Sequence, residues 1–174
     1  MNQTSRPVVE TIEEKPYLAI QSVVAPDNFR AVIDQNFPRI PAWLAERGQA
    51  MSAPPFIRYL SVDHEGNPSK IEMGATVGEM IEPEVGFTSG ILPAGRYLTY
   101  THTGPFQHEE LDDLRDATEM MLAWARENGI ELDRTETPEG TEFGASLEFY
   151  LVDPGQEPDF TKWQTRIEML TVPA

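Results

Sequence analysis

The chain contains an internal repeat that restricts its fold more than any other feature of the sequence. Residues 42–48 read AWLAERG, and residues 123–129 read AWARENG, 81 positions later. Further matches flank this pair in the same order: Tyr17-Leu18 with Tyr97-Leu98, Tyr59-Leu60 with Tyr150-Leu151, and Ile71-Glu72-Met73 with Ile167-Glu168-Met169. Ordered self-similarity of this kind predicts two related units that bury their apolar faces against each other.

Each unit reads as strand, helix, strand, strand. Pro38 and Pro41 can split the first helix into two short ones, and Gly129 is a natural stop for the second. The pattern predicts an α+β fold of duplicated βαββ units, about 8–78 and 88–174, with pseudo-two-fold symmetry around a central ligand cleft. The expected strands are 17–24, 57–62, 71–77, 96–103, 144–152 and 162–172, with helices after Asp27 and over 107–128, a turn at 63–68 and a linker at 79–93.

Length and composition limit the classes of protein that fit. The 174 residues, 40% of them hydrophobic, suit one domain over 1–174. No cysteine is present, which excludes disulfides and thiolate sites. The net charge of −16 opposes direct nucleic-acid binding and docking on anionic membranes. Neither a secretory signal nor a membrane-spanning run is visible, so we expect a cytoplasmic protein.

The strand around Glu148 carries the candidate site. Alternation places Ser146, Glu148 and Tyr150 on one face, which we assign to the side away from the helices. The repeat puts Ile57 where the second unit has Glu148, so the fold itself does not require the carboxylate. A desolvated carboxylate needs a partner, and aromatic walls attract organic cations. The expected ligand-binding residues are Glu148, Tyr150, Tyr59, Phe56, Ile57, Tyr97, Trp163 and His102, while the same alternation places Arg58 on the helix side.

Several short stretches resemble the GyrI-like small-molecule-binding family, also called the AraC effector-binding domain family. These are PPFIRY at 54–59, LPAGRY at 92–97, HTGP at 102–105, LEFYL at 147–151 and the late Lys162-Trp163. The resemblance covers about 7–174 and implies a central ligand cleft. It also implies that Glu148 matches the family's cleft glutamate, which engages cationic lipophilic drugs in multidrug-sensing members, and that this chain is a stand-alone member.

Three functions are compatible with these observations. The first is a sensor or sequestering protein for small, amphipathic, cationic and aromatic molecules, with a separate DNA-binding regulator or protein target as its partner. The second is a hydrolase of electrophilic, cyclopropane-containing natural products, with Glu148 as general base and Tyr150 or Tyr97 as hydrogen-bond donor. The third is an acidic, DNA-mimicking partner of gyrase type. We expect no metal site, because His102 and His108 lack the spacing of a zinc motif, and no cofactor.

Overall fold

The computed structural model describes residues 6–63, 65 and 68–173. Within this part of the chain, the strands form one ten-stranded sheet in which all neighbours are antiparallel. The main path runs β1-β6-β10-β9-β3-β4-β2-β5, with β7 and β8 beside β3. The elements are β1 (Val8–Ile12), β2 (Lys15–Val24), α1 (Phe29–Asn36), α2 (Arg39–Glu46), β3 (Phe56–Val62), β4 (Ser69–Thr76), β5 (Thr88–Leu92), β6 (Gly95–Thr103), α3 (Leu114–Glu127), β7 (Arg134–Thr137), β8 (Gly140–Phe143), β9 (Ser146–Tyr150), the 3-10 turn η1 (Phe160–Lys162) and β10 (Gln164–Leu170).

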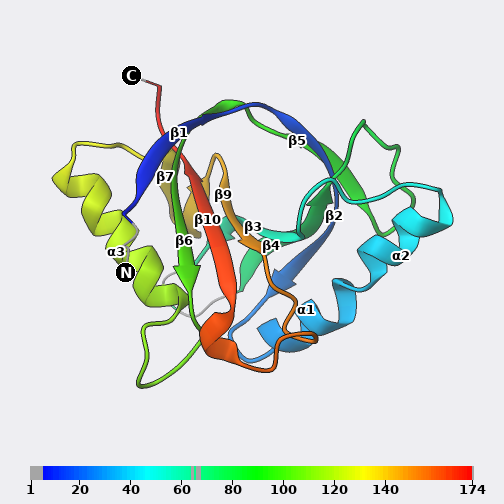
Figure 1. Ribbon diagram of the computed structural model, residues 1–174. Helices are drawn as coiled ribbons and strands as arrows, with labels where there is room; N and C mark the ends of the chain where they lie inside the picture. The colour runs from blue at the N-terminus through cyan, green and yellow to red at the C-terminus, as the bar shows by residue number, and fades with distance from the viewer. Residues whose placement is uncertain (1–5, 64, 66–67, 174) are drawn as a thin grey trace.

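The sheet curls, and its two edge strands β1 and β5 arch over the top of the molecule in Figure 1. Ile12 at one edge and Leu92 at the other pack into the same apolar cluster, together with Tyr17, Phe56 and Tyr97. This cluster lies on the inner, concave side of the curl. The α+β class is thus confirmed, in the form of one curled sheet.

All three helices cover the other face of the sheet. Helices α1 and α2 pack over β2, β3 and β4 through a cluster that contains Ile40, Trp43 and Leu44. Helix α3 packs over β6 and β10 through Met121 and Ala125. Figure 1 shows the two helical layers on opposite sides of the molecule, with the middle of the sheet between them. The central strands β3 and β9, which pair with each other, therefore lie between the helical layers.

Local sequence explains most element boundaries. Pro38 is the N-cap of α2, as expected for a proline that divides the segment into two helices. The second helix, however, begins at Leu114 and not at residue 107. Asp113 accepts hydrogen bonds from the backbone N–H groups of Arg115 and Asp116, and Asp116 caps the Asp113 N–H in return. This capping box fixes the start of α3, so the acidic residues before it form a loop.

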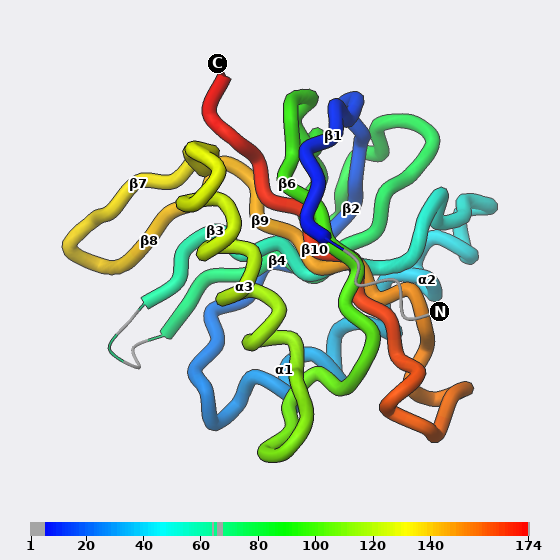
Figure 2. The backbone as a smooth tube through the Cα atoms, turned by 60° about the vertical axis from the view of Figure 1, so that its left-hand side comes forward, coloured from blue at the N-terminus to red at the C-terminus, as the bar shows by residue number. Residues whose placement is uncertain are grey.

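Four strands fall where no strand was expected. Residues 88–92 of the expected linker form β5 against β2, and residues 8–12 form β1 against β6. The β7–β8 hairpin stands out beside the β3–β4 hairpin in Figure 2 and pairs with the end of β3. The expected turn at 63–68 lies largely outside the described residues. No helix in the described ranges is long and apolar enough to cross a membrane.

Candidate functional site

Glu148 lies at the middle of β9, on the face of the sheet that carries the helices. Its neighbours on that face, Tyr59 and Tyr150, pack against the cluster under α1 and α2. The prediction that Glu148 faces away from the helices is therefore wrong. Alternation identifies correctly which residues share a face, but both faces of β9 are covered: Ala145, Leu147 and Phe149 fill the concave core.

Two tyrosines hold the Glu148 carboxylate. The Tyr150 hydroxyl donates a hydrogen bond to Oε2 over 2.7 Å, and the Tyr59 hydroxyl donates to the same oxygen over 3.1 Å. Among the described residues, Oε1 accepts no hydrogen bond and Glu148 forms no ion pair. The carboxylate is thus oriented from one side only, and its second oxygen is left for another partner.

Burial dominates the electrostatics of this trio. Desolvation raises the pKa of Glu148 above its ordinary value, although the hydrogen bonds from Tyr150 and Tyr59 act in the opposite direction. Burial and the neighbouring carboxylate also hold the pKa of Tyr59 and of Tyr150 well above the usual range. The tyrosines therefore remain protonated donors at neutral pH, and an ionised Glu148 has no cationic partner among the described residues.

Aromatic rings pack around Tyr150, which holds Glu148. The Tyr150 ring makes edge contacts with Phe37, the residue after α1 (ring centroids 5.9 Å apart), and with Phe106, in the loop after β6 (ring centroids 5.4 Å apart). Phe106 also lies against Trp163, with centroids 4.7 Å apart. A ring cluster beside an uncompensated carboxylate is a suitable environment for an organic cation.

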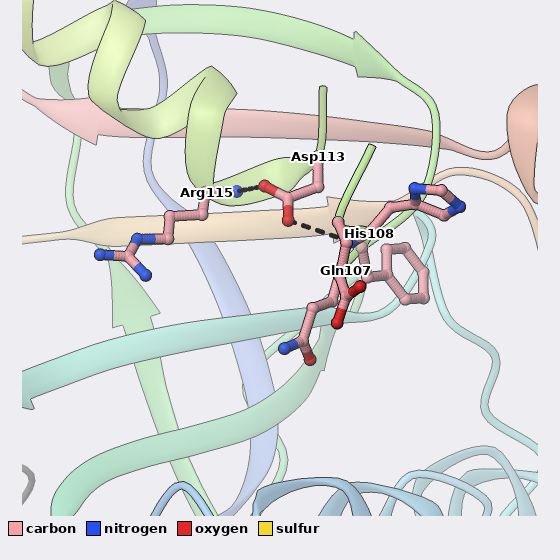
Figure 3. A pocket seen from close by; sticks show the side chains of 6 residues that line it. Gln107, His108, Asp113 and Arg115 are labelled. Atoms are coloured by element: carbon pink, nitrogen blue, oxygen red, sulfur yellow. Dashed lines mark hydrogen bonds between the residues drawn. The ribbon is translucent and has the colours of Figure 1, made fainter. Parts of the chain in front are cut away.

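A recess of about 480 Å³ opens on the outer side of Phe106 (Figure 3). It is lined by Phe106, Gln107, His108, Glu109, Asp113 and Arg115. Figure 3 shows Asp113 at its back, bonded to the backbone of His108 and Arg115, with the Gln107 and Arg115 side chains extending outward. Phe106 connects the recess with the Glu148 trio, because it lines the recess and its ring contacts Tyr150.

Some of the other expected site residues lie near the Glu148 trio, and others lie on the opposite face of the sheet. Ile57 pairs directly with Glu148 and is buried below the trio, and Trp163 belongs to the ring cluster. His102 is buried, with Nε2 3.3 Å from the Pro105 carbonyl oxygen. Phe56 and Tyr97 are not brought to Glu148, because both face the concave core, where burial raises the pKa of Tyr97 to about 12.

Arg58 also lies on the concave side, so its expected place on the helix side is wrong. Its guanidinium donates to the Tyr17 hydroxyl (3.1 Å) and to the Gly144 carbonyl (2.9 Å), and lies 3.8 Å from Glu72 Oε1. Tyr17 donates in turn to the same Glu72 oxygen. This buried network ties β2, β3 and β4 together inside the curl and explains an arginine in a core strand.

Sequence reasoning did not find Phe37 and Phe106 as site residues. Phe37 has the spacing of an apolar helix face, which gives no reason to separate it from the core residues of that helix. Phe106 follows Gly104-Pro105, a pattern that predicts a turn and does not indicate that the next residue contacts the site. In the described part of the chain, no group of three or more His, Asp or Glu side chains is arranged to hold a metal ion.

Solved structures with the same fold include the C-terminal domain of a protein that is also solved in complex with DNA, and a ligand complex. The chain is similar to the C-terminal domain of EcmrR, with a TM-score of 0.73 and 18% identity, covering 99% of this chain and 100% of that one. EcmrR in a complex with DNA gives a TM-score of 0.75 and 19% identity over 98% of this chain, which spans 58% of that longer chain.

More distant similarities include a ligand complex and a hydrolase. SAV2435 bound to tetraphenylphosphonium gives a TM-score of 0.61 at 8% identity, covering 96% of this chain and 94% of that one. A hydrolase from Listeria innocua gives 0.59 at 13% identity, covering 96% and 92%. At these identities the similarity establishes the fold alone. No curated protein matches the sequence.

The sequence itself matches a family model over almost its whole length. The model describes the GyrI-like small-molecule-binding domain and aligns with residues 6–170. That range contains every strand and helix of the curled sheet and all members of the Glu148 trio and its ring cluster. The chain belongs to the GyrI-like small-molecule-binding domain family.

Proposed function

We propose that this protein binds small, lipophilic, aromatic cations at Glu148. The observation that carries the proposal is the carboxylate itself: it is desolvated, held by two tyrosine hydroxyls at one oxygen, and forms no ion pair in the described part of the chain. A buried charge of this kind is costly without a counter-ion. A cation that reaches Oε1 supplies that counter-ion.

The surroundings favour a large organic cation over a metal ion. Phe37, Tyr150 and Trp163 offer aromatic rings to an organic cation, whereas a single carboxylate does not satisfy a small, strongly hydrated cation. The tetraphenylphosphonium complex of SAV2435, a protein with the same fold, supports this choice. By the same comparison, EcmrR places such a domain in a DNA-bound regulator, so a sensing role with a separate DNA-binding partner is part of the proposal.

Titration calorimetry with tetraphenylphosphonium tests the proposal. Glu148→Gln keeps the shape and removes the charge. We expect its affinity to fall by about 10- to 100-fold, the range for a hydrogen bond or contact to a charged group. The matched control is Glu142→Gln on the exposed strand β8, which should bind as the wild type does.

A neutral probe separates charge recognition from hydrophobic binding. Triphenylphosphine oxide should lose little affinity on Glu148→Gln. Equal losses for the cation and the neutral probe would mean that Glu148 does not read charge. Failure of tetraphenylphosphonium to bind the wild type would reject the cation-binding function outright.

The same carboxylate also suits a second function, hydrolysis of an electrophilic substrate. A raised pKa and an Oε1 that accepts no hydrogen bond among the described residues suit a general base for water, and Tyr150 would have to release Glu148 before it could donate to a developing anion. Turnover of a cyclopropane-containing alkylating agent by the wild type, and its loss in Glu148→Gln, would establish this function. Binding of the substrate without turnover would favour the sensing function over hydrolysis.

We also infer that the two units arose by duplication and are related by a pseudo-two-fold axis between β3 and β9. The sheet order supports this, because β4 and β2 follow β3 on one side as β10 and β6 follow β9 on the other. Superposition of the units in an experimental structure tests it: Trp43 should fall on Trp124 and Tyr59 on Tyr150.

A further inference from the structure

We propose that the Thr165 hydroxyl is a second polar contact for the ligand, covered by the Phe106 ring while the site is empty. The ligand class that fits is a planar aromatic cation with an N–H or O–H substituent on its ring system. This inference rests on the proposed cation-binding function and adds a second recognition point to it.

Thr165 is an unusual residue within β10. It is completely buried, and its Oγ1 is one of only two buried side-chain atoms among the described residues that have no hydrogen-bond partner; the other, Arg58 Nε, lies on the concave side. Leaving a buried hydroxyl unpaired is destabilising, and such atoms are rare in folded proteins. A valine of the same shape would avoid the cost, so the hydroxyl calls for an explanation.

Strand register places Thr165 at the floor of the site. It lies directly opposite Tyr150 in β9 and directly opposite His102 in β6. Directly opposed residues project to the same face of a sheet, so Thr165 shares the helix-bearing face with Tyr150. Trp163, two residues earlier in the chain, lies just before β10 begins.

Phe106 is the cover. Its ring contacts Tyr150, which lies opposite Thr165, and Trp163, which lies two residues before Thr165 in the chain. The residue before it, Pro105, is held over the sheet by the contact of its carbonyl oxygen with His102. A ligand ring that replaces Phe106 would stack on the same two aromatic side chains and lie against Oγ1.

Thr165 and Glu148 are close enough for one ligand to reach both. Glu148 is opposite Ile167, the next residue of β10 on the helix-bearing face. Thr165 and Glu148 are therefore diagonal neighbours, and the Cα atoms of such neighbours are about 7–8 Å apart. A fused three-ring cation with a ring amine spans a distance of this order. The carboxylate would read the charge and the threonine hydroxyl would accept from the substituent.

Two dyes that differ only in this substituent test the proposal. Proflavine carries ring amino groups, whereas acridine orange carries dimethylamino groups that cannot donate. Thr165→Val removes the hydroxyl and keeps the shape. We expect proflavine affinity to fall by about 3- to 10-fold, the value of one hydrogen bond, and acridine orange and tetraphenylphosphonium affinities to change less than twofold.

A matched control removes a buried threonine hydroxyl elsewhere. Thr99→Val on β6 deletes a hydroxyl that donates to the Val8 carbonyl oxygen on the concave side. It should lower the melting temperature without changing the affinity for either dye. Thr165→Val should leave the melting temperature of the free protein unchanged or raise it, because no hydrogen bond is lost. If Thr165→Val does not fold, Thr165→Ala against Thr165→Ser gives the same comparison.

The outcomes are distinct from those of the proposed function. Failure of all three cations to bind would reject cation binding, and this inference with it. Tetraphenylphosphonium binding without proflavine binding would overturn the Thr165 proposal alone. An equal loss of affinity for both dyes on Thr165→Val would also overturn it, because it indicates a packing effect. No loss of proflavine affinity would overturn it too, because the hydroxyl would then be one that the fold merely tolerates.

Discussion

Tyr150 donates a 2.7 Å hydrogen bond to Glu148, its neighbour two positions earlier on the same face of β9. One strand thus supplies both the charge and the group that orients it. Tyr59 reaches the same carboxylate oxygen from β3, the adjacent strand. The two central strands of the sheet therefore fix Glu148 independently of the loops around the site, which is how a preorganised binding group is held.

Cation affinity should depend on pH through Glu148. Burial raises the pKa of this carboxyl above its ordinary value of 4.5, so a bound proton competes with the cation at acidic pH. Tetraphenylphosphonium affinity should rise with pH and level off above the raised pKa, and Glu148→Gln should abolish this dependence. Calorimetry in buffers of different ionisation enthalpy should show proton release on binding near the midpoint.

The same pKa gives a stability prediction of definite sign. The folded protein binds the Glu148 proton more tightly than the unfolded chain does, so the free energy of unfolding contributed by this group falls as pH rises from 4.5 through the raised pKa. Glu148→Gln should remove this decline and be more stable than the wild type above the window. Urea titrations at several pH values measure the difference; a wild type that gains stability over this window relative to the variant would contradict it.

The two tyrosine hydroxyls should contribute unequally. Removal of a donor to the charged form raises the pKa of a carboxyl. Tyr150→Phe loses the shorter bond and should raise the Glu148 pKa further, and Tyr59→Phe should raise it less. A carbon-13 NMR titration of the Glu148 carboxyl checks this. The control is Tyr100→Phe, because the Tyr100 hydroxyl makes no hydrogen bond among the described residues. This variant should leave the Glu148 pKa unchanged.

Phe106 should act as a competitor of the ligand. Phe106→Ala removes ring contacts with Tyr150 and Trp163 and should lower the free energy of unfolding by about 1–3 kcal/mol. The cost of displacing the ring disappears with it, so tetraphenylphosphonium should bind more tightly and faster. Phe160→Ala, which contacts Trp163 but not Tyr150, should not improve binding. Weaker binding by Phe106→Ala would make Phe106 a wall of the site instead of its cover.

Asp113 should stabilise both α3 and the loop that carries Phe106. Its carboxylate accepts from the backbone N–H groups of Arg115 and Asp116 and, across the loop, from that of His108. Asp113→Ala should cost about 0.5–2 kcal/mol of stability, the usual value of an N-cap. Asp112→Ala, one residue earlier and exposed, should cost little. Thermal unfolding of both variants provides the comparison, and equal losses would rule out a specific cap.

Sequence patterns predicted the local elements where the pattern is itself local. The prolines at 38 and 41 predicted a division of the first helical segment, and the structure has α1 and α2 there, with Pro38 between them and Pro41 in the first turn of α2. Alternation in β9 grouped Glu148 with Tyr150 on one face, and the repeat identified Tyr59 as the matching tyrosine of the other unit. Those three side chains do meet, because β3 and β9 pair in the centre of the sheet.

Tertiary structure alone decided which face is which and what covers the site. A period of two cannot distinguish the faces of a strand when both are buried, and the curl of the sheet buries the second face around Phe56 and Tyr97. Likewise, the contacts of Phe37 and Phe106 with Tyr150 join residues far apart in the chain, which no local periodicity encodes. The sequence by itself determined the carboxylate and its tyrosines; the closure of the sheet and the packing of the loops determined the surroundings in which that carboxylate acts.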